Sequence, residues 1–82
     1  MGFKAKMYDM ITGQGDDLHV LEKNGEIELW IVYDHESKGD PFGRAPLYQL
    51  WNADTRVYAG PSMRYAYEKY NSEVLSYYEE NY

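Results

Sequence analysis

An Asn-Gly pair ahead of a β-rich run is the feature that most constrains how this chain folds. Asn24-Gly25 is the strongest short-range signal for a two-residue hairpin turn, because both positions of a type I′ turn need positive φ. The run that follows, Ile27 to Tyr33, is rich in β-branched and aromatic residues. A turn at these two residues would place Lys23 opposite Glu26, Val20 opposite Leu29, and Leu18 opposite Ile31. We therefore predict an antiparallel hairpin at the centre of the fold.

Alternation along this hairpin separates two faces, because successive side chains of a strand point to opposite sides of the sheet. The apolar face, predicted to form the core, carries Leu18, Val20, Ile27, Leu29, Ile31 and Tyr33, with Glu22 near the tip. The mixed face carries His19, Leu21, Lys23, Glu26, Glu28, Trp30 and Val32. We expect the mixed face to be exposed unless the N-terminal segment or a partner covers it.

A second hairpin and a helix complete the predicted fold. Strands at 47–51 and 56–59 around a four-residue turn would set Leu50 against Val57 and Tyr48 against Ala59. The same hairpin would bring Trp51 beside Arg56 for a cation–π contact. Gly60-Pro61-Ser62 then signals a helix start, with Ser62 or Gly60 as the N-cap. Apolar residues follow at three- and four-residue steps, at Met63, Ala66, Tyr67, Tyr70, Val74 and Tyr77.

The N-terminal segment 3–12 fits two readings. Phe3, Ala5, Met7 and Ile11 alternate as in a strand, whereas Phe3, Met7, Met10 and Ile11 also form a helical stripe. We favour a strand, because no N-cap residue precedes the segment. The predicted fold class is therefore α+β: a small antiparallel sheet of three to five strands, in two hairpins, with a C-terminal helix packed on one face. Residues 1–82 are expected to form a single domain.

Chain length and composition bound the class of protein. With 82 residues the chain is near the lower limit for folding on one hydrophobic core. It has no cysteine, which excludes disulfides and thiolate metal sites and fits a reducing compartment. No apolar run resembles a signal peptide, and the longest, Leu29 to Tyr33, is too short to span a bilayer. We expect a soluble, cytoplasmic protein with no membrane partner.

The negative charge is concentrated in one segment. Between Asp16 and Asp40 there are eight acidic and two basic residues, a net charge of −6, while the rest of the chain has six of each. Acidic surfaces repel nucleic-acid phosphates but attract basic proteins, including those that bind nucleic acid. Glu26 and Glu28 would share a face about 6.8 Å apart, roughly two per-strand base steps of DNA, as in a nucleic-acid mimic. The alternative is that the acids only prevent association of strand edges.

Catalytic and metal-binding patterns are weak. Asp34-His35-Glu36, with Asp40 nearby, is the densest group of metal-ligand types, but adjacent strand residues point apart, so we expect a solvated loop. No serine has the context of a nucleophile elbow, and no Cys–His pair is possible. We therefore predict neither enzymatic activity nor a metal or cofactor.

Contact-forming residue types are more prominent. The long connection after the first hairpin presents Phe42 and Arg44, whose types are enriched in interface hot spots. Tyr67, Tyr70 and Tyr77 are expected to pack in the core. The tyrosines expected to be exposed and suited to a binding surface are Tyr58, Tyr65, Tyr78 and Tyr82. The predicted partner-binding residues are Glu26, Glu28, Trp30, Asp34, Glu36, Phe42 and Arg44.

The leading hypothesis is a non-enzymatic protein that docks on a basic, nucleic-acid-binding protein and does not itself bind nucleic acid. In size, acidity and lack of catalytic residues the chain resembles, in kind and without a family motif, phage-encoded inhibitors of host or defence machinery, anti-CRISPR proteins among them. The alternative is a self-associating structural or accessory subunit. In that case a homodimer would bury the uncovered sheet face, with Trp30 and Val32 at its centre.

Overall fold

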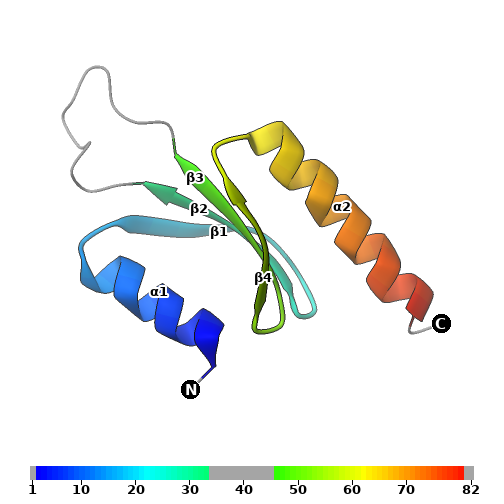
Figure 1. The fold of residues 1–82 in the computed structure, drawn as a ribbon, viewed down its shortest axis with the longest axis horizontal. Coiled ribbons are helices and arrows are strands. Elements are labelled where there is room, and N and C mark those ends of the chain that lie inside the picture. The colour runs from blue at the N-terminus through cyan, green and yellow to red at the C-terminus, as the bar shows by residue number, and fades with distance from the viewer. Residues whose placement is uncertain (1, 34–45, 81–82) are drawn as a thin grey trace.

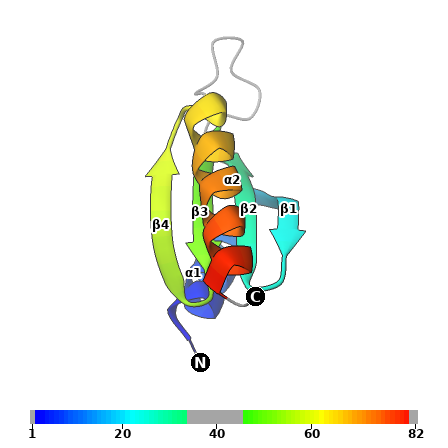
Figure 2. The same ribbon diagram turned by 90° about the vertical axis from the view of Figure 1, so that its right-hand side faces the viewer.

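The chain forms a central sheet with one helix on each face. The computed structural model describes residues 2–33 and 46–80. Its elements are α1 (Phe3–Gly13), β1 (Asp17–Asn24), β2 (Ile27–Tyr33), β3 (Leu47–Asn52), β4 (Thr55–Gly60) and α2 (Met63–Glu80). The strands lie in the order β1-β2-β3-β4, and all neighbours are antiparallel. Figures 1 and 2 show the sheet between the two helices. The predicted α+β class, with two hairpins and a C-terminal helix on one face, is confirmed.

The larger core lies between the sheet and α2. Strand residues Ile27, Leu29, Ile31, Tyr48 and Leu50 are buried there against Ala66 of the helix. The helix adds Tyr67, Tyr70, Val74 and Tyr77 to the same core, so the predicted stripe is confirmed except at its first position. Met63 is exposed. The Ser62 side-chain oxygen accepts a hydrogen bond from the Tyr65 N–H at 3.1 Å, which confirms the predicted N-cap.

A second core fills the space between the sheet and α1. It consists of Ile11, Trp30, Val32 and Trp51, with Met7 and Leu18 packed against them. The two indole rings lie 5.2 Å apart. Each indole N–H is satisfied by a side chain two residues earlier: Trp30 Nε1 donates to Glu28 at 3.3 Å, and Trp51 Nε1 donates to the buried Gln49 at 3.2 Å. The sheet face that carries Trp30 and Val32 is therefore covered by α1, and both of its indole N–H groups are paired.

Segment 3–12 is a helix, and the strand favoured from sequence is wrong. The prediction relied on the lack of a preceding N-cap residue. The cap comes instead from Asp54, in the turn between β3 and β4, whose carboxylate accepts hydrogen bonds from the N–H groups of Phe3 and Lys4, both at 2.7 Å. These bonds satisfy two of the donors that a helix start leaves unpaired. A residue about fifty positions away therefore determines where α1 begins.

The first hairpin forms, but its register differs from the predicted one. Asn24 pairs with Ile27, so the two turn residues are Gly25 and Glu26. Gly25 has φ of 61°, the positive value that a Gly-first type II′ turn needs, and Glu26 does not share it. A bulge at Leu21 then shifts the pairing again, so that Val20 pairs with Trp30.

The consequence is that part of β1 points to the other face. Leu18 and Val20, predicted on the larger core, lie on the α1 side with Trp30 and Val32, while His19 pairs with Ile31 on the α2 side. The bulge adds one unpaired residue to β1 and, since side chains alternate with a period of two, it exchanges the faces of the residues that precede it.

The second hairpin has a two-residue turn at Ala53-Asp54, shorter than the predicted four residues. Trp51 pairs with Arg56 as predicted, but a bulge places Leu50 opposite Tyr58 instead of Val57. Tyr48 consequently pairs with Gly60 and not with Ala59. The Trp51 ring packs against the rings of Phe3 and Trp30 on the α1 side, with the Phe3 ring 5.6 Å away.

Candidate interaction surface

The turn of the first hairpin lies against the C-terminal half of α2. A Cβ placed on Gly25 would be 3.7 Å from the Tyr77 ring, and the Tyr78 hydroxyl donates to the Asn24 side-chain oxygen at 3.2 Å. The Tyr77 and Tyr78 rings are perpendicular neighbours, 5.8 Å apart. Residues that are about fifty positions apart in sequence therefore form one surface, which combines the acidic hairpin with tyrosines.

We call this patch the acidic–tyrosine surface. Its members are Glu22, Asn24, Glu26, Tyr70, Tyr77 and Tyr78. Glu22 pairs with Leu29 in the sheet and so lies on the α2 side. Partial burial, with the nearby charge of Glu22, raises the pKa of the Tyr70 hydroxyl above its usual value of 10.0. A side-chain hydrogen bond between Tyr70 and Asn24 joins α2 to the hairpin turn.

The turn that carries Glu26 is held in place from two sides. The N–H of Ala53, in the turn of the second hairpin, donates to the Glu26 carbonyl oxygen at 2.9 Å. On the other side Tyr77 packs against Gly25. Glu26 itself is exposed. Its carboxylate thus projects from a backbone that is fixed before any partner arrives, which reduces the ordering cost of binding.

Glu26 and Glu28 do not form the evenly spaced pair predicted on one strand face. Because the turn is shifted by one residue, Glu26 lies in the turn and β2 begins at Ile27. Glu28 lies on the α1 side of the sheet, where the Lys4 ammonium forms an ion pair with it. The spacing argument for nucleic-acid mimicry therefore has no basis in this fold.

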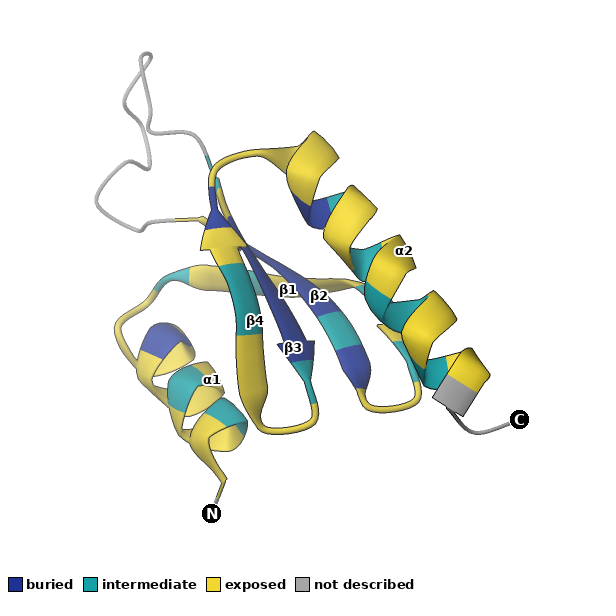
Figure 3. Cartoon of the chain, turned by 45° about the vertical axis from the view of Figure 1, so that its right-hand side comes forward, coloured by how far each residue is buried: buried dark blue, intermediate teal, exposed yellow. Residues whose placement is uncertain are grey.

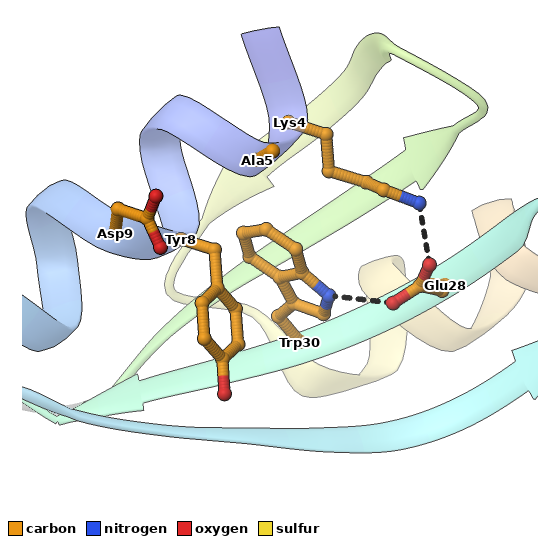
Figure 4. Close-up of a pocket in the computed structure, with 6 residues that line it drawn as sticks. All are labelled: Lys4, Ala5, Tyr8, Asp9, Glu28 and Trp30. Atoms are coloured by element: carbon orange, nitrogen blue, oxygen red, sulfur yellow. Dashed lines mark hydrogen bonds and ion pairs between the residues drawn. The ribbon is translucent and has the colours of Figure 1, made fainter. Parts of the chain in front are cut away.

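Glu28 lines a groove between α1 and β2. The groove has a volume of about 290 Å³ and is lined by Lys4, Ala5, Tyr8, Asp9, Glu28 and Trp30. Figure 4 shows the helix residues on one wall, with Glu28 and Trp30 on the strand. Its two strongest polar groups, Lys4 and Glu28, are already bonded to each other. Asp9 is the remaining charged residue of the lining.

The ionisation of Glu28 follows from these contacts. Partial burial alone would raise the pKa of this carboxyl, but hydrogen bonds from Lys4 and Trp30 and the Lys4 charge outweigh burial, so the pKa lies below its usual 4.5. Glu28 is therefore ionised at neutral pH, and its carboxylate is already bonded to Lys4 and Trp30 within the fold. It connects α1 to the sheet and is a poorer partner contact than Glu26.

Trp30 is not on the surface. It is only 1% exposed, beneath α1, and Tyr8 packs on its ring at 5.8 Å. Of the two ways in which we expected this sheet face could be covered, the N-terminal segment is the one observed, because α1 lies over it. Dimerisation stays a prediction, but Trp30 and Val32 would reach a second copy only if α1 moved away.

Four predicted contact residues, Asp34, Glu36, Phe42 and Arg44, lie outside the described residues, as does the Asp34-His35-Glu36 group. Within residues 2–33 and 46–80 no three His, Asp or Glu side chains are grouped closely enough to hold a metal ion. Neither described helix is long and apolar enough to cross a membrane.

No protein-family model, curated protein or solved structure matches this chain. The interaction surface therefore has to be assessed from its own residues. Sequence reasoning identified Glu26 and the exposure of Tyr78, which is 48% exposed. It missed Glu22, Asn24 and the position of Tyr70 and Tyr77 beside them. The only sequence signal for these contacts is the helical stripe. It predicts that α2 packs on the sheet, but it does not indicate which end of the helix lies beside the acidic turn.

Proposed function

We propose that this protein binds a basic, nucleic-acid-binding protein through the acidic–tyrosine surface and acts as a non-enzymatic inhibitor, of the kind that phages encode. The observation that carries the proposal is the contact between the hairpin turn and the end of α2. It joins carboxylates, which attract basic side chains, to tyrosines, which supply contact area with few rotatable bonds.

Arginine is the partner side chain that this combination suits best. Its guanidinium pairs with carboxylates and also stacks on aromatic rings. Proteins that bind nucleic acids are rich in arginine and lysine, because these residues neutralise phosphates. A partner of this class would be bound through the basic side chains with which it binds nucleic acid. Binding of this protein would therefore compete with binding of nucleic acid. Asp34, Glu36, Phe42 and Arg44, which lie outside the described residues, stay predicted contacts.

The test compares matched variants for binding to a host protein captured by pull-down and then purified. Glu26→Lys and Tyr78→Ala should each weaken affinity about tenfold or more, which corresponds to ~1.4 kcal/mol. The controls Glu68→Lys and Tyr65→Ala lie near the other end of α2, and Tyr65 is 47% exposed, almost as much as Tyr78. We expect the controls to bind like the unmodified protein.

Two measurements separate binding from inhibition. Affinity should fall as salt is raised, and less steeply for Glu26→Lys, because a charge contact has been removed. A bound partner should also lose its affinity for nucleic acid. If variants and controls bind equally, the acidic–tyrosine surface is not the binding site. If the partner keeps its nucleic acid while bound, the interaction stands and the inhibitory role is wrong.

A further inference from the structure

Strand β1 is an open edge of the sheet. Within the described chain it pairs with β2 alone, and it runs for eight residues from Asp17 to Asn24. It has more exposed residues than the other strands, and Figure 3 colours it as exposed or intermediate. The outer side of an edge strand presents a row of N–H and C=O groups that can pair with another chain.

The side chains of β1 differ in polarity between the two faces of the sheet. Leu18 and Val20 lie on the α1 side, because they pair with Val32 and Trp30. Val20 is 44% exposed, and Tyr8 of α1 is also exposed where it packs on the Trp30 ring. These three side chains form an apolar ledge along the edge.

The α2 side of the same edge is polar and acidic. His19 pairs with Ile31, and Glu22 pairs with Leu29, whose side chains belong to the core under α2. Glu22 also belongs to the acidic–tyrosine surface, so the edge is continuous with the site proposed above. Asp16 and Asp17 add negative charge at the start of the strand.

We infer that β1 accepts an extended segment of the partner as a fifth strand, a segment in which basic and apolar residues alternate. Its apolar side chains would lie on the ledge of Tyr8, Leu18 and Val20, and its basic side chains would lie near Glu22. The inference rests on the proposed function, since it specifies the part of the basic partner that is bound. Backbone pairing would supply affinity, and the alternating side chains would supply selectivity.

The charge of the β1 edge favours a basic segment of a partner over a second copy of this chain. Two copies each carry a net charge of −6, so their association at this acidic edge is opposed by electrostatic repulsion. A basic strand would meet the carboxylates of this edge favourably. The bulge at Leu21 interrupts regular pairing, so a partner strand would pair regularly with Asp17 to Val20 and would reach Glu22 beyond the bulge.

The test uses three synthetic octapeptides with identical side-chain composition. In the first, arginine and valine alternate. In the second, the same residues are in two blocks. The third has the alternating order with its internal amides N-methylated, so it keeps its charge but cannot donate to a neighbouring strand. We expect the alternating peptide to bind at least about tenfold more tightly than either of the others. On its binding, hydrogen exchange of β1 amides should slow.

A protein variant tests the ledge itself. Val20→Lys places a charge at the exposed edge and should weaken binding of the alternating peptide about tenfold. Leu75→Lys is the matched control, because Leu75 is 63% exposed on α2 and the change in net charge is the same. It should leave binding unchanged.

The outcomes distinguish the two proposals. If all three peptides bind equally, with an affinity that falls on Glu26→Lys, the strand inference is wrong and the acidic–tyrosine surface stands. If none of them binds, the strand inference is wrong. If in addition the captured host protein ignores Glu26→Lys and Tyr78→Ala, the proposed function fails as well.

Discussion

At the scale of single residues, Asp54 has a structural role that its exposed position conceals. Its two carboxylate oxygens accept hydrogen bonds from the first two N–H groups of α1. A negative charge is favourable at a helix N-terminus, where the helix dipole is positive. These two backbone hydrogen bonds hold the pKa of Asp54 below its usual 3.8. One turn residue therefore links the second hairpin to the first helix.

We predict that Asp54→Ala lowers the melting temperature at about pH 7 and does so much less at about pH 3. Because the pKa is lower in the folded state, the carboxylate stabilises the fold fully above the unfolded value near 3.8. That stability is lost as the pH falls through the folded pKa. Thermal melts across this pH range check the prediction. Asp9→Ala, which removes an exposed carboxylate from α1 without removing a cap, is the control. An equal effect of Asp54→Ala at both pH values would contradict it.

At the scale of elements, α1 depends on its contact with the sheet. Only Ile11 is buried in this helix, and Met7 packs beside it on the tryptophan core. A helix of 11 residues is marginal by itself in water, so its stability comes from packing and from the Asp54 cap. Loss of the packing should release the helix and expose the Trp30 ring.

We predict that Ile11→Ala reduces the free energy of unfolding by about 2–5 kcal/mol, the usual cost of truncating a buried aliphatic side chain. Met10→Ala is the neighbouring control: Met10 is 51% exposed whereas Ile11 is 7% exposed. The control should cost no more than about 0.5 kcal/mol. Chemical denaturation gives both values. A red shift of tryptophan emission in native buffer would show that α1 has detached from the sheet. Equal costs for the two variants would mean that α1 is not packed as described.

At the scale of the whole molecule, one sheet serves two cores. Leu50 and Trp51 are neighbours on β3 and are both fully buried, but Leu50 contacts the α2 core and Trp51 the α1 core. The sheet cannot lose one layer without exposing the apolar face that the layer covered. We therefore expect the helices and the sheet to unfold together.

The corresponding prediction is that unfolding curves from far-UV circular dichroism and from tryptophan fluorescence coincide, as in a two-state transition. Leu50→Ala should lower stability by about 2–5 kcal/mol and Trp51→Ala by about 3–5 kcal/mol. Both losses should appear with either probe, although each side chain touches a different helix. Curves that separate, with Trp51→Ala affecting fluorescence alone, would show that the layer of α1 unfolds independently.

Local patterns in the sequence predicted much of this architecture. Turn residues and β-rich runs located both hairpins, and the periodicity after Ser62 located α2 and most of its buried face. These features could be predicted because turn chemistry and side-chain periodicity act between near neighbours. Within the candidate site, the sequence also indicated the acidic hairpin and the exposed Tyr78.

Other features depend on contacts between distant residues, and only the tertiary structure decided them. The helical state of α1 requires the Asp54 cap, and the burial of Trp30 requires α1. Which side of the sheet each β1 side chain faces depends on a bulge at Leu21, and no local residue pattern predicts that bulge. The acidic turn meets Tyr77 and Tyr78 because α2 crosses the sheet toward that end. The sequence by itself determined the two hairpins and α2, since turn chemistry and side-chain periodicity depend on neighbouring residues. Packing across the sheet decided how they pair and which surface they share.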